Sequence, residues 1–300
     1  MQKLSAKQAR QQLRKLNAAP LSEKVKRAQR IIRSTIHTGK AFLSFSGGRD
    51  SVAMALLTDT VDDSIPWVYI DTGLAAPELD AFVRDFGGDR LTILRPPCHP
   101  ETTWKETGRL PIGAKVSARY YRADNPDLRI GARDCCQVHK AGPNREYLNA
   151  QGCAALLIGA RGDDSKRHAF KLQTGEIVTS DDGYFLSYPL LTWRRRDVLA
   201  YLDEHFPKYP LRYPANQDLG CLPCAVNLAF YPNQLSILRA TRPDYYRRVI
   251  VELGFGLEIL KLKYGLTEQG ARDLVARDGW DSLIDSGALD KIPQPRTGWR

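Results

Sequence analysis

The sequence predicts an α/β fold in which a parallel β-sheet is covered by helices on both faces. Short apolar segments alternate with longer segments of helical period between residues 41 and 158. Brief apolar runs of this kind are typical of parallel strands buried on both faces. Such strands are joined by right-handed crossovers, and their ligands bind beyond the carboxyl ends of the strands. We expect strands at residues 41–45, 67–70, 91–94 and 154–158.

Three consecutive segments differ in composition, which suggests three parts of the chain. Residues 1–40 form a basic N-terminal helical segment, with a helix that follows Ser22 and ends before Gly39. Residues 41–225 contain the four expected strands and form the α/β domain. Residues 226–300 contain helical stretches with no clear strand, so we expect a helical C-terminal region.

The net charge of +10 is concentrated at one end of the chain. Residues 1–40 hold 11 of the 44 basic residues and one of the 34 acidic residues, so the remainder carries 33 of each. This asymmetry favours contact with a polyanion or an acidic protein, and a solvated helical face is the alternative.

No stretch approaches the roughly 20 apolar residues of a membrane span, and the first residues lack the apolar core of a signal peptide. We therefore expect a cytoplasmic protein without membrane contact.

A glycine-rich turn joins the first expected strand to a helix. It consists of Ser44, Phe45, Ser46, Gly47, Gly48, Arg49, Asp50 and Ser51. Backbone N–H groups of such a turn and the positive end of the helix form an anion site, which the glycines let phosphate approach closely. The serine hydroxyls can donate hydrogen bonds, and Asp50 can cap the helix or help to hold Mg²⁺. An ordinary glycine turn is the alternative, and the Walker pattern is absent.

The segment from Ser46 to Ser51 resembles the SGGxDS motif of PP-loop ATP pyrophosphatases, which cleave ATP between the α and β phosphates. Within that superfamily the chain is most similar to the sulfonucleotide (PAPS/APS) reductase group. The similarity continues at the strand end Asp71-Thr72-Gly73, in the loop at 159–165, and in Pro189-Leu190 with Trp193 and Asp197. It implies an adenine nucleotide α-hydrolase-like fold.

The resemblance also implies roles for single residues. Nucleotide contacts are expected from Ser44, Ser46, Gly47, Gly48, Arg49, Asp50, Ser51, Asp71, Thr72, Gly73, Gly159, Arg161 and Arg167. Catalytic roles are expected for Asp50, Ser51 and Arg161. Asp71 can accept from a ribose hydroxyl or position a metal, or it can simply form the turn before Gly73. Arg161 and Arg167 can neutralise phosphate through charge-assisted hydrogen bonds.

Six cysteines in a reducing compartment indicate metal or redox chemistry and not a disulfide framework. Four of them fall into two motifs, Cys135-Cys136 and Cys221-Leu-Pro-Cys224. Four thiolates suit either tetrahedral zinc or an iron–sulfur cluster. The arrangement resembles the set that holds a [4Fe–4S] cluster in bacterial APS reductases and in DndC/SspD proteins, which favours the cluster. Lys140 matches a family position between the cluster and a substrate phosphate.

The resemblance does not extend to the nucleophilic cysteine of the reductases. Sulfonucleotide reductases use a cysteine near the C-terminus, whereas this sequence contains no cysteine after Cys224. We therefore expect that the usual reduction of PAPS or APS does not occur.

The resemblance to DndC/SspD proteins implies an ATP pyrophosphatase that activates a nucleic-acid backbone oxygen for sulfur incorporation. The substrates and cofactors are then ATP, Mg²⁺, a [4Fe–4S] cluster and a nucleic acid, DNA being favoured over tRNA. Implied partners are a cysteine desulfurase as sulfur donor and other phosphorothioation proteins. The alternatives are a sulfonucleotide reductase, a tRNA-thiolation enzyme, and a non-catalytic nucleotide sensor or scaffold.

Overall fold

The structure is a computed structural model that describes residues 6–107, 135–163, 175–210, 220–221 and 234–289. The chain divides into two compact units that alternate along the sequence. Unit 1 contains Met1–Asp71, Pro77–Leu94 and Pro143–Arg212. Unit 2 contains Thr72–Ala76, Arg95–Gly142 and Tyr213–Arg300.

Unit 1 is built on a six-stranded sheet in the order β3-β2-β1-β4-β6-β5. The parallel strands are β1 (Ala41–Ser44), β2 (Trp67–Ile70), β3 (Leu91–Leu94), β4 (Ala155–Ile158) and β6 (Phe185–Ser187). Strand β5 (Ile177–Thr179) pairs antiparallel with β6 at one edge. The predicted α/β fold with a mostly parallel sheet is confirmed, and β5 and β6 are additional to the four expected strands.

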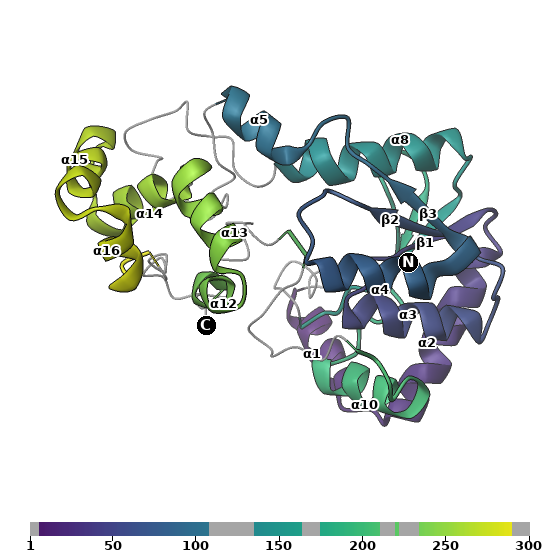
Figure 1. Cartoon of the computed structure of the whole chain (residues 1–300). Coiled ribbons are helices and arrows are strands. Elements are labelled where there is room, and N and C mark those ends of the chain that lie inside the picture. The colour runs from purple at the N-terminus through teal and green to yellow at the C-terminus, as the bar shows by residue number, and fades with distance from the viewer. Residues whose placement is uncertain (1–5, 108–134, 164–174, 211–219, 222–233, 290–300) are drawn as a thin grey trace. The chain divides into compact units, whose positions relative to one another are not determined.

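Helices cover both faces of this sheet, as Figure 1 shows. On one face are α2 (Leu21–Ile36), α3 (Arg49–Asp59) and α4 (Pro77–Gly87), with α10 (Arg195–His205) packed against α3. On the other face is α8 (Gly142–Ala150). Successive residues of a strand point to opposite faces of the sheet, so the strands contact helices on both faces. Phe42 of β1 packs with Leu148 of α8 on one face, whereas Trp67 of β2 stacks on Phe86 of α4 on the other.

The strand order places a switch point between β1 and β4. From β1 the chain passes through α3 to β2 on one side, and it later returns to β4 on the other side of β1. Ser44 at the end of β1 lies in register with Ile158 at the end of β4. The loops that follow these two strands therefore start side by side, at the position where open α/β sheets bind ligands.

The N-terminal helix α1 (Ala6–Asn17) also belongs to unit 1. Its Leu13 packs against Tyr188 and Leu191, which follow β6. Helix α2 packs against α3, β4 and β6, with Ala28 and Ile32 fully buried. Basic residues of the N-terminal segment are thus carried by helices whose apolar residues contribute to the core of unit 1.

The described elements of unit 2 are helical. They are α5 (Pro100–Thr107), the π-helical turn η3 (Gln137–Ala141), α12 (Gln234–Thr241), α13 (Pro243–Arg247), the π-helical turn η5 (Arg248–Glu252), α14 (Phe255–Tyr264), α15 (Glu268–Asp278) and α16 (Trp280–Asp285). Arg248 of η5 forms an ion pair with the buried Glu101 of α5, and the Trp104 and Phe255 rings lie 5.7 Å apart. No helix in the described ranges is both long and apolar enough to cross a membrane.

Candidate functional site

The loop after β1 is a tight turn held by its own serines. The backbone N–H of Ser46 donates to Ser51 Oγ at 3.2 Å, and the two hydroxyl oxygens are 3.1 Å apart. Ser51 Oγ in turn donates to the carbonyl of Gly48 at 2.8 Å. Helix α3 begins at Arg49, directly after this turn, and the first N–H groups of a helix have no partner within it. The turn and the helix end together offer donors suited to an anion.

Gly47 cannot be replaced by a larger residue without a change in this turn. Its φ is +71°, in the left-handed region that favours glycine. A Cβ atom at this position would lie 2.4 Å from Val83 Cγ2 and 2.7 Å from Leu79 Cδ1, both on α4. The Gly47 carbonyl also accepts a hydrogen bond of 3.0 Å from the Tyr209 hydroxyl. The glycine is therefore enclosed by α4 and by the segment that follows α10.

The loop after β4 touches the loop after β1. A Cβ atom on Gly159 would lie 2.7 Å from the carbonyl oxygen of Asp50, so only glycine allows this approach. Arg161 follows, with its Nε 2.8 Å from Asp50 Oδ1 and its Nη1 2.8 Å from Asp163 Oδ1. Only 9% of Arg161 is exposed. The structure thus brings together Asp50, Ser51 and Arg161, the three residues with expected catalytic roles.

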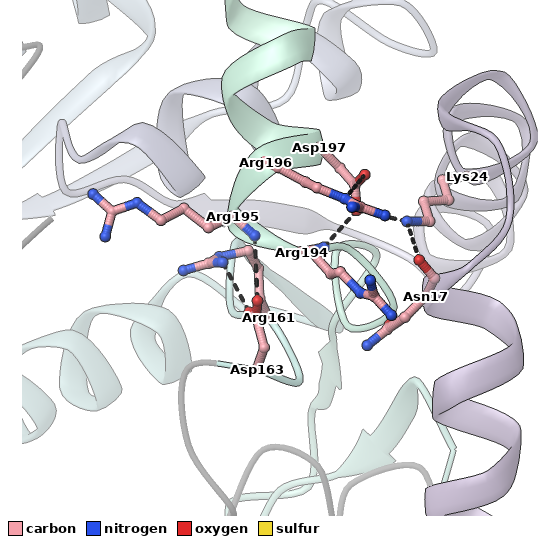
Figure 2. Close-up of polar contacts among 8 residues, drawn as sticks. All are labelled: Asn17, Lys24, Arg161, Asp163, Arg194, Arg195, Arg196 and Asp197. Atoms are coloured by element: carbon pink, nitrogen blue, oxygen red, sulfur yellow. Dashed lines mark hydrogen bonds and ion pairs between the residues drawn. The ribbon is translucent and has the colours of Figure 1, made fainter.

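A chain of polar contacts connects this loop to the N-terminal helices, as Figure 2 shows. Asp163 Oδ2 accepts a 3.2 Å hydrogen bond from the backbone N–H of Arg195, at the start of α10. Two residues later, the Asp197 carboxylate caps the same helix and lies 2.5 Å from Lys24 Nζ of α2. Lys24 Nζ also donates to the carbonyl of Asn17, at 2.9 Å. Sequence patterns do not reveal this link, because Lys24 is one of many basic residues in its segment.

Asp71 follows β2 and has its own cationic partner. Its Oδ2 lies 2.8 Å from Arg84 Nη2 of α4, and its backbone N–H donates to the carbonyl of Leu94 at 2.8 Å. Arg84 also pairs with Asp80, and the hydrogen bond with Asp80 is the main cause of the raised pKa of Arg84. The expected contact between Asp71 and a ribose hydroxyl stays a prediction, as does the role of Arg167, which lies outside the described residues.

Thr72 and Gly73 belong to unit 2, together with the described cysteines of the two motifs. The Thr72 hydroxyl oxygen lies 3.4 Å from Cys221 Sγ. Gly73 has a φ of +72°, and a Cβ there would lie 2.8 Å from His99 Nε2. The strand end predicted to contact a nucleotide therefore also contacts one of the predicted cluster ligands.

Three of the four predicted cluster ligands are described. The pKa of Cys135 is raised to about 11, mainly by burial and also by the nearby Cys136 and Cys221, whereas a hydrogen bond with Trp104 and the charge of Lys140 act in the opposite direction. Desolvation also raises the pKa of Cys136, although this residue is exposed. The three thiols and Lys140 therefore share one neighbourhood.

The described residues of this neighbourhood do not by themselves form a metal site. No group of three or more His, Cys, Asp or Glu side chains within the described ranges is arranged to hold a metal ion. Cys224, the fourth predicted ligand, lies outside those ranges. The iron–sulfur cluster therefore stays a prediction.

Comparison with known proteins identifies the family. Residues 40–227, more than half of the chain, match the phosphoadenosine phosphosulfate reductase domain. The chain belongs to this family. The matched region contains the loops after β1, β2 and β4 and both cysteine motifs. The predicted membership of the PAPS/APS reductase-like superfamily is confirmed, whereas nucleotide binding by this chain stays a prediction.

Several relatives in the phosphoadenosine phosphosulfate reductase domain family are named as reductases. An adenosine 5'-phosphosulfate reductase of Deinococcus radiodurans is 30% identical over 162 residues, which cover 52% of this chain and 55% of that protein. One of Salinibacter ruber is 34% identical over 162 residues, covering 52% and 56%. A phosphoadenosine 5'-phosphosulfate reductase of Alkalilimnicola ehrlichii is 28% identical over 190 residues, covering 61% and 69%. The chain thus spans little more than half the length of the two adenosine 5'-phosphosulfate reductases.

A solved structure is also similar. The crystal structure of phosphoadenylyl-sulfate (PAPS) reductase from Candida auris, a phosphate complex, matches with a TM-score of 0.43 and 18% identity. The match covers 67% of this chain and 87% of that chain.

Proposed function

We propose that the chain is an enzyme that binds an adenine nucleotide at the switch point between β1 and β4, with the phosphates on the turn from Ser46 to Ser51. The observation that supports this most directly is the contact of the two loops, in which Gly159 packs on the Asp50 backbone and Arg161 pairs with Asp50. A cation, a helix N-terminus and a glycine turn meet there, which is a favourable environment for phosphate.

The ion pair between Arg161 and Asp50 suggests how the site responds to its ligand. A phosphate oxygen competes with the Asp50 carboxylate for the Arg161 guanidinium. Asp50 would then be one of the residues that could help to hold Mg²⁺, which prefers carboxylate and phosphate oxygens. Asp163 remains beside Arg161, at 2.8 Å, and keeps the guanidinium at the loop during this exchange.

The first candidate substrate is a sulfonucleotide, because the relatives described above are named as APS or PAPS reductases. Cys135, Cys136 and Cys221, with Cys224, would hold the [4Fe–4S] cluster. Such a cluster would supply a charged, redox-active group, and Lys140 is close enough to Cys135 to interact with it. Binding of iron would displace the thiol protons that the raised pKa of Cys135 otherwise retains.

The second candidate is an ATP pyrophosphatase that activates a nucleic-acid oxygen for sulfur incorporation, as in DNA phosphorothioation. The burial of Cys98 and Cys153, the two cysteines outside the predicted cluster, favours this second candidate. Cys153 is partly buried and burial raises its pKa to about 11, so it is a poor nucleophile at neutral pH. Cys98 is also partly buried, with its sulfur 3.3 Å from the Thr103 hydroxyl oxygen. Neither thiol is fully exposed, whereas attack on a sulfonucleotide requires an accessible nucleophile.

One experiment separates the two candidates. The full chain, purified without oxygen, is incubated with APS or PAPS and a dithiol reductant, and sulfite release is measured. In parallel it is incubated with ATP and Mg²⁺, alone or with DNA or tRNA, and pyrophosphate release is measured. Sulfite release establishes the first candidate and pyrophosphate release the second, with the stimulating nucleic acid identifying the acceptor. Nucleotide binding without either product would instead indicate a sensor or scaffold.

Two variants test whether the site is correctly placed. Asp50→Ala and Ser46→Ala should abolish product formation in whichever assay is positive. Ser46 lies in the loop, and Arg161 keeps Asp163 as its partner in Asp50→Ala, so the thermal unfolding midpoint should change little. Product formation at the wild-type rate in either variant would show that the turn after β1 is not the phosphate site.

A further inference from the structure

The Tyr209 side chain contacts the phosphate loop from a distant part of the sequence. It is 3% exposed, and its hydroxyl donates a 3.0 Å hydrogen bond to the carbonyl of Gly47, 162 residues earlier. We propose that Tyr209 is a positioning residue, which holds the peptide between Gly47 and Gly48 with its N–H directed toward the nucleotide phosphates. This inference rests on the proposed phosphate-binding role of the loop.

The geometry of a peptide bond explains how a bond to a carbonyl can control an N–H. The peptide is planar and trans, so the Gly48 N–H points away from the Gly47 carbonyl. A peptide between two glycines rotates more freely than others, because neither residue has a Cβ. If this peptide turned over, a carbonyl oxygen would face the phosphate in place of an N–H donor. The Tyr209 hydroxyl opposes that rotation because it retains the carbonyl on its own side.

The tyrosine is itself held in place. Its ring lies edge-on to Phe82 of α4, with 5.5 Å between centroids, and 6.0 Å from the ring of Phe206. Helix α4 also supplies Leu79 and Val83, the two side chains that enclose Gly47. The same helix therefore fixes both the glycine and the residue that bonds to it, so the Tyr209 hydroxyl is a rigid partner.

The test removes the hydroxyl alone. In Tyr209→Phe the ring packing is retained, and the affinities for ATP, APS and adenosine are measured by calorimetry on the full chain. Removal of one hydrogen bond should weaken binding of the phosphate-containing ligand by about 3- to 10-fold. Binding of adenosine, which has no phosphate, should be unchanged. The matched control is Tyr201→Phe, which removes another buried tyrosine hydroxyl, from a ring packed on Trp193 at 5.5 Å.

The outcomes are distinguishable. A selective loss for ATP or APS in Tyr209→Phe, absent in Tyr201→Phe, supports the positioning role. An equal loss for adenosine and the phosphate ligand, or no loss, overturns it while the proposed function stands. If the wild-type chain binds neither ATP nor APS, both are overturned. Because the ratio compares two ligands on one protein, a partly unfolded sample leaves it unchanged.

Discussion

Gly159 is the residue at which the two nucleotide loops come closest. A Cβ there would lie 2.7 Å from the Asp50 carbonyl oxygen and 3.2 Å from Ser51 Cα. These are backbone atoms, which cannot move aside as a side chain can. We therefore expect Gly159→Ala to displace the Asp50–Arg161 pair and to weaken nucleotide binding by at least about tenfold, as measured by titration with ATP and APS.

The matched control for this substitution is Gly270→Ala in α15. A Cβ at Gly270 meets nothing closer than Thr267 Oγ1, at 3.4 Å. Alanine is favoured over glycine within a helix by about 0.5–1 kcal/mol, so the free energy of unfolding should rise slightly and nucleotide affinity should not change. Wild-type affinity in Gly159→Ala would contradict the proposed contact between the loops.

At this scale the sequence is informative about residue types but not about their partners. Serines, glycines and Asp50 in one turn indicate an anion site by their chemistry alone. That Arg161 pairs with Asp50, or that Tyr209 bonds to Gly47, depends on which strand ends are neighbours. Separations of 111 and 162 residues are beyond the reach of any local pattern.

Helix α2 is connected to α10 by a buried ion pair. Lys24 is 2% exposed, and its Nζ lies 2.5 Å from Asp197 Oδ2. Replacing one partner leaves an uncompensated charge inside the protein, so Lys24→Met should lower the free energy of unfolding by about 3–5 kcal/mol. Chemical denaturation of the full chain, followed by fluorescence, measures this change.

The double variant Lys24→Met with Asp197→Asn provides the control. Asparagine can still cap α10, as Asp197 does by accepting from the Arg194 N–H at 2.7 Å, but it carries no charge. Much of the lost stability should therefore return. By comparison, Arg272→Gln breaks an exposed pair with Glu268 and should cost less than about 1 kcal/mol. A small effect of Lys24→Met alone would mean that the pair is not buried in solution.

At the scale of elements, the prediction is good where a segment is long or strongly apolar. The expected strands at 67–70 and 91–94 match β2 and β3, and those at 41–45 and 154–158 differ from β1 and β4 by one residue. Strands β5 and β6 have three residues each, too few to show a period. They are recognisable only through their pairing with β4 and with each other.

For the whole molecule, the main untested prediction is the cluster. We expect about four irons per chain in protein prepared without oxygen, as a Cys₄-held cubane requires. Cys135→Ser and Cys221→Ser should lose most of this iron. Cys153→Ser is the control, because Cys153 packs beside the sheet of unit 1 and should leave the iron content unchanged. Stoichiometric zinc without visible absorbance would contradict the prediction.

Some of the basic residues in 1–40 form ion pairs with other parts of unit 1. Lys24 is buried in its ion pair and Arg27 lies 2.7 Å from Glu176, whereas Arg14 and Lys15 are exposed. If the chain binds duplex DNA through this segment, Arg14→Gln with Lys15→Gln should reduce the salt dependence of binding. The slope changes by roughly 0.9 for each phosphate that the variant no longer neutralises. An unchanged slope would mean that these cations face solvent or contact a protein partner.

The predicted division of the chain at residues 40 and 225 stays a prediction.

The ion pair between Lys24 and Asp197 also has a consequence for how the protein is made. Its two residues are 173 positions apart, and unit 1 is complete only when Arg212 has been added. A ribosome that adds roughly 5–20 residues per second needs about 9–35 s between the two residues. Throughout that interval the lysine lacks the Asp197 carboxylate, and for most of it the apolar face of α2 has neither β4 nor β6 to cover it. We therefore expect chaperones to bind the nascent chain. Slower translation between Lys24 and Asp197 should increase its aggregation.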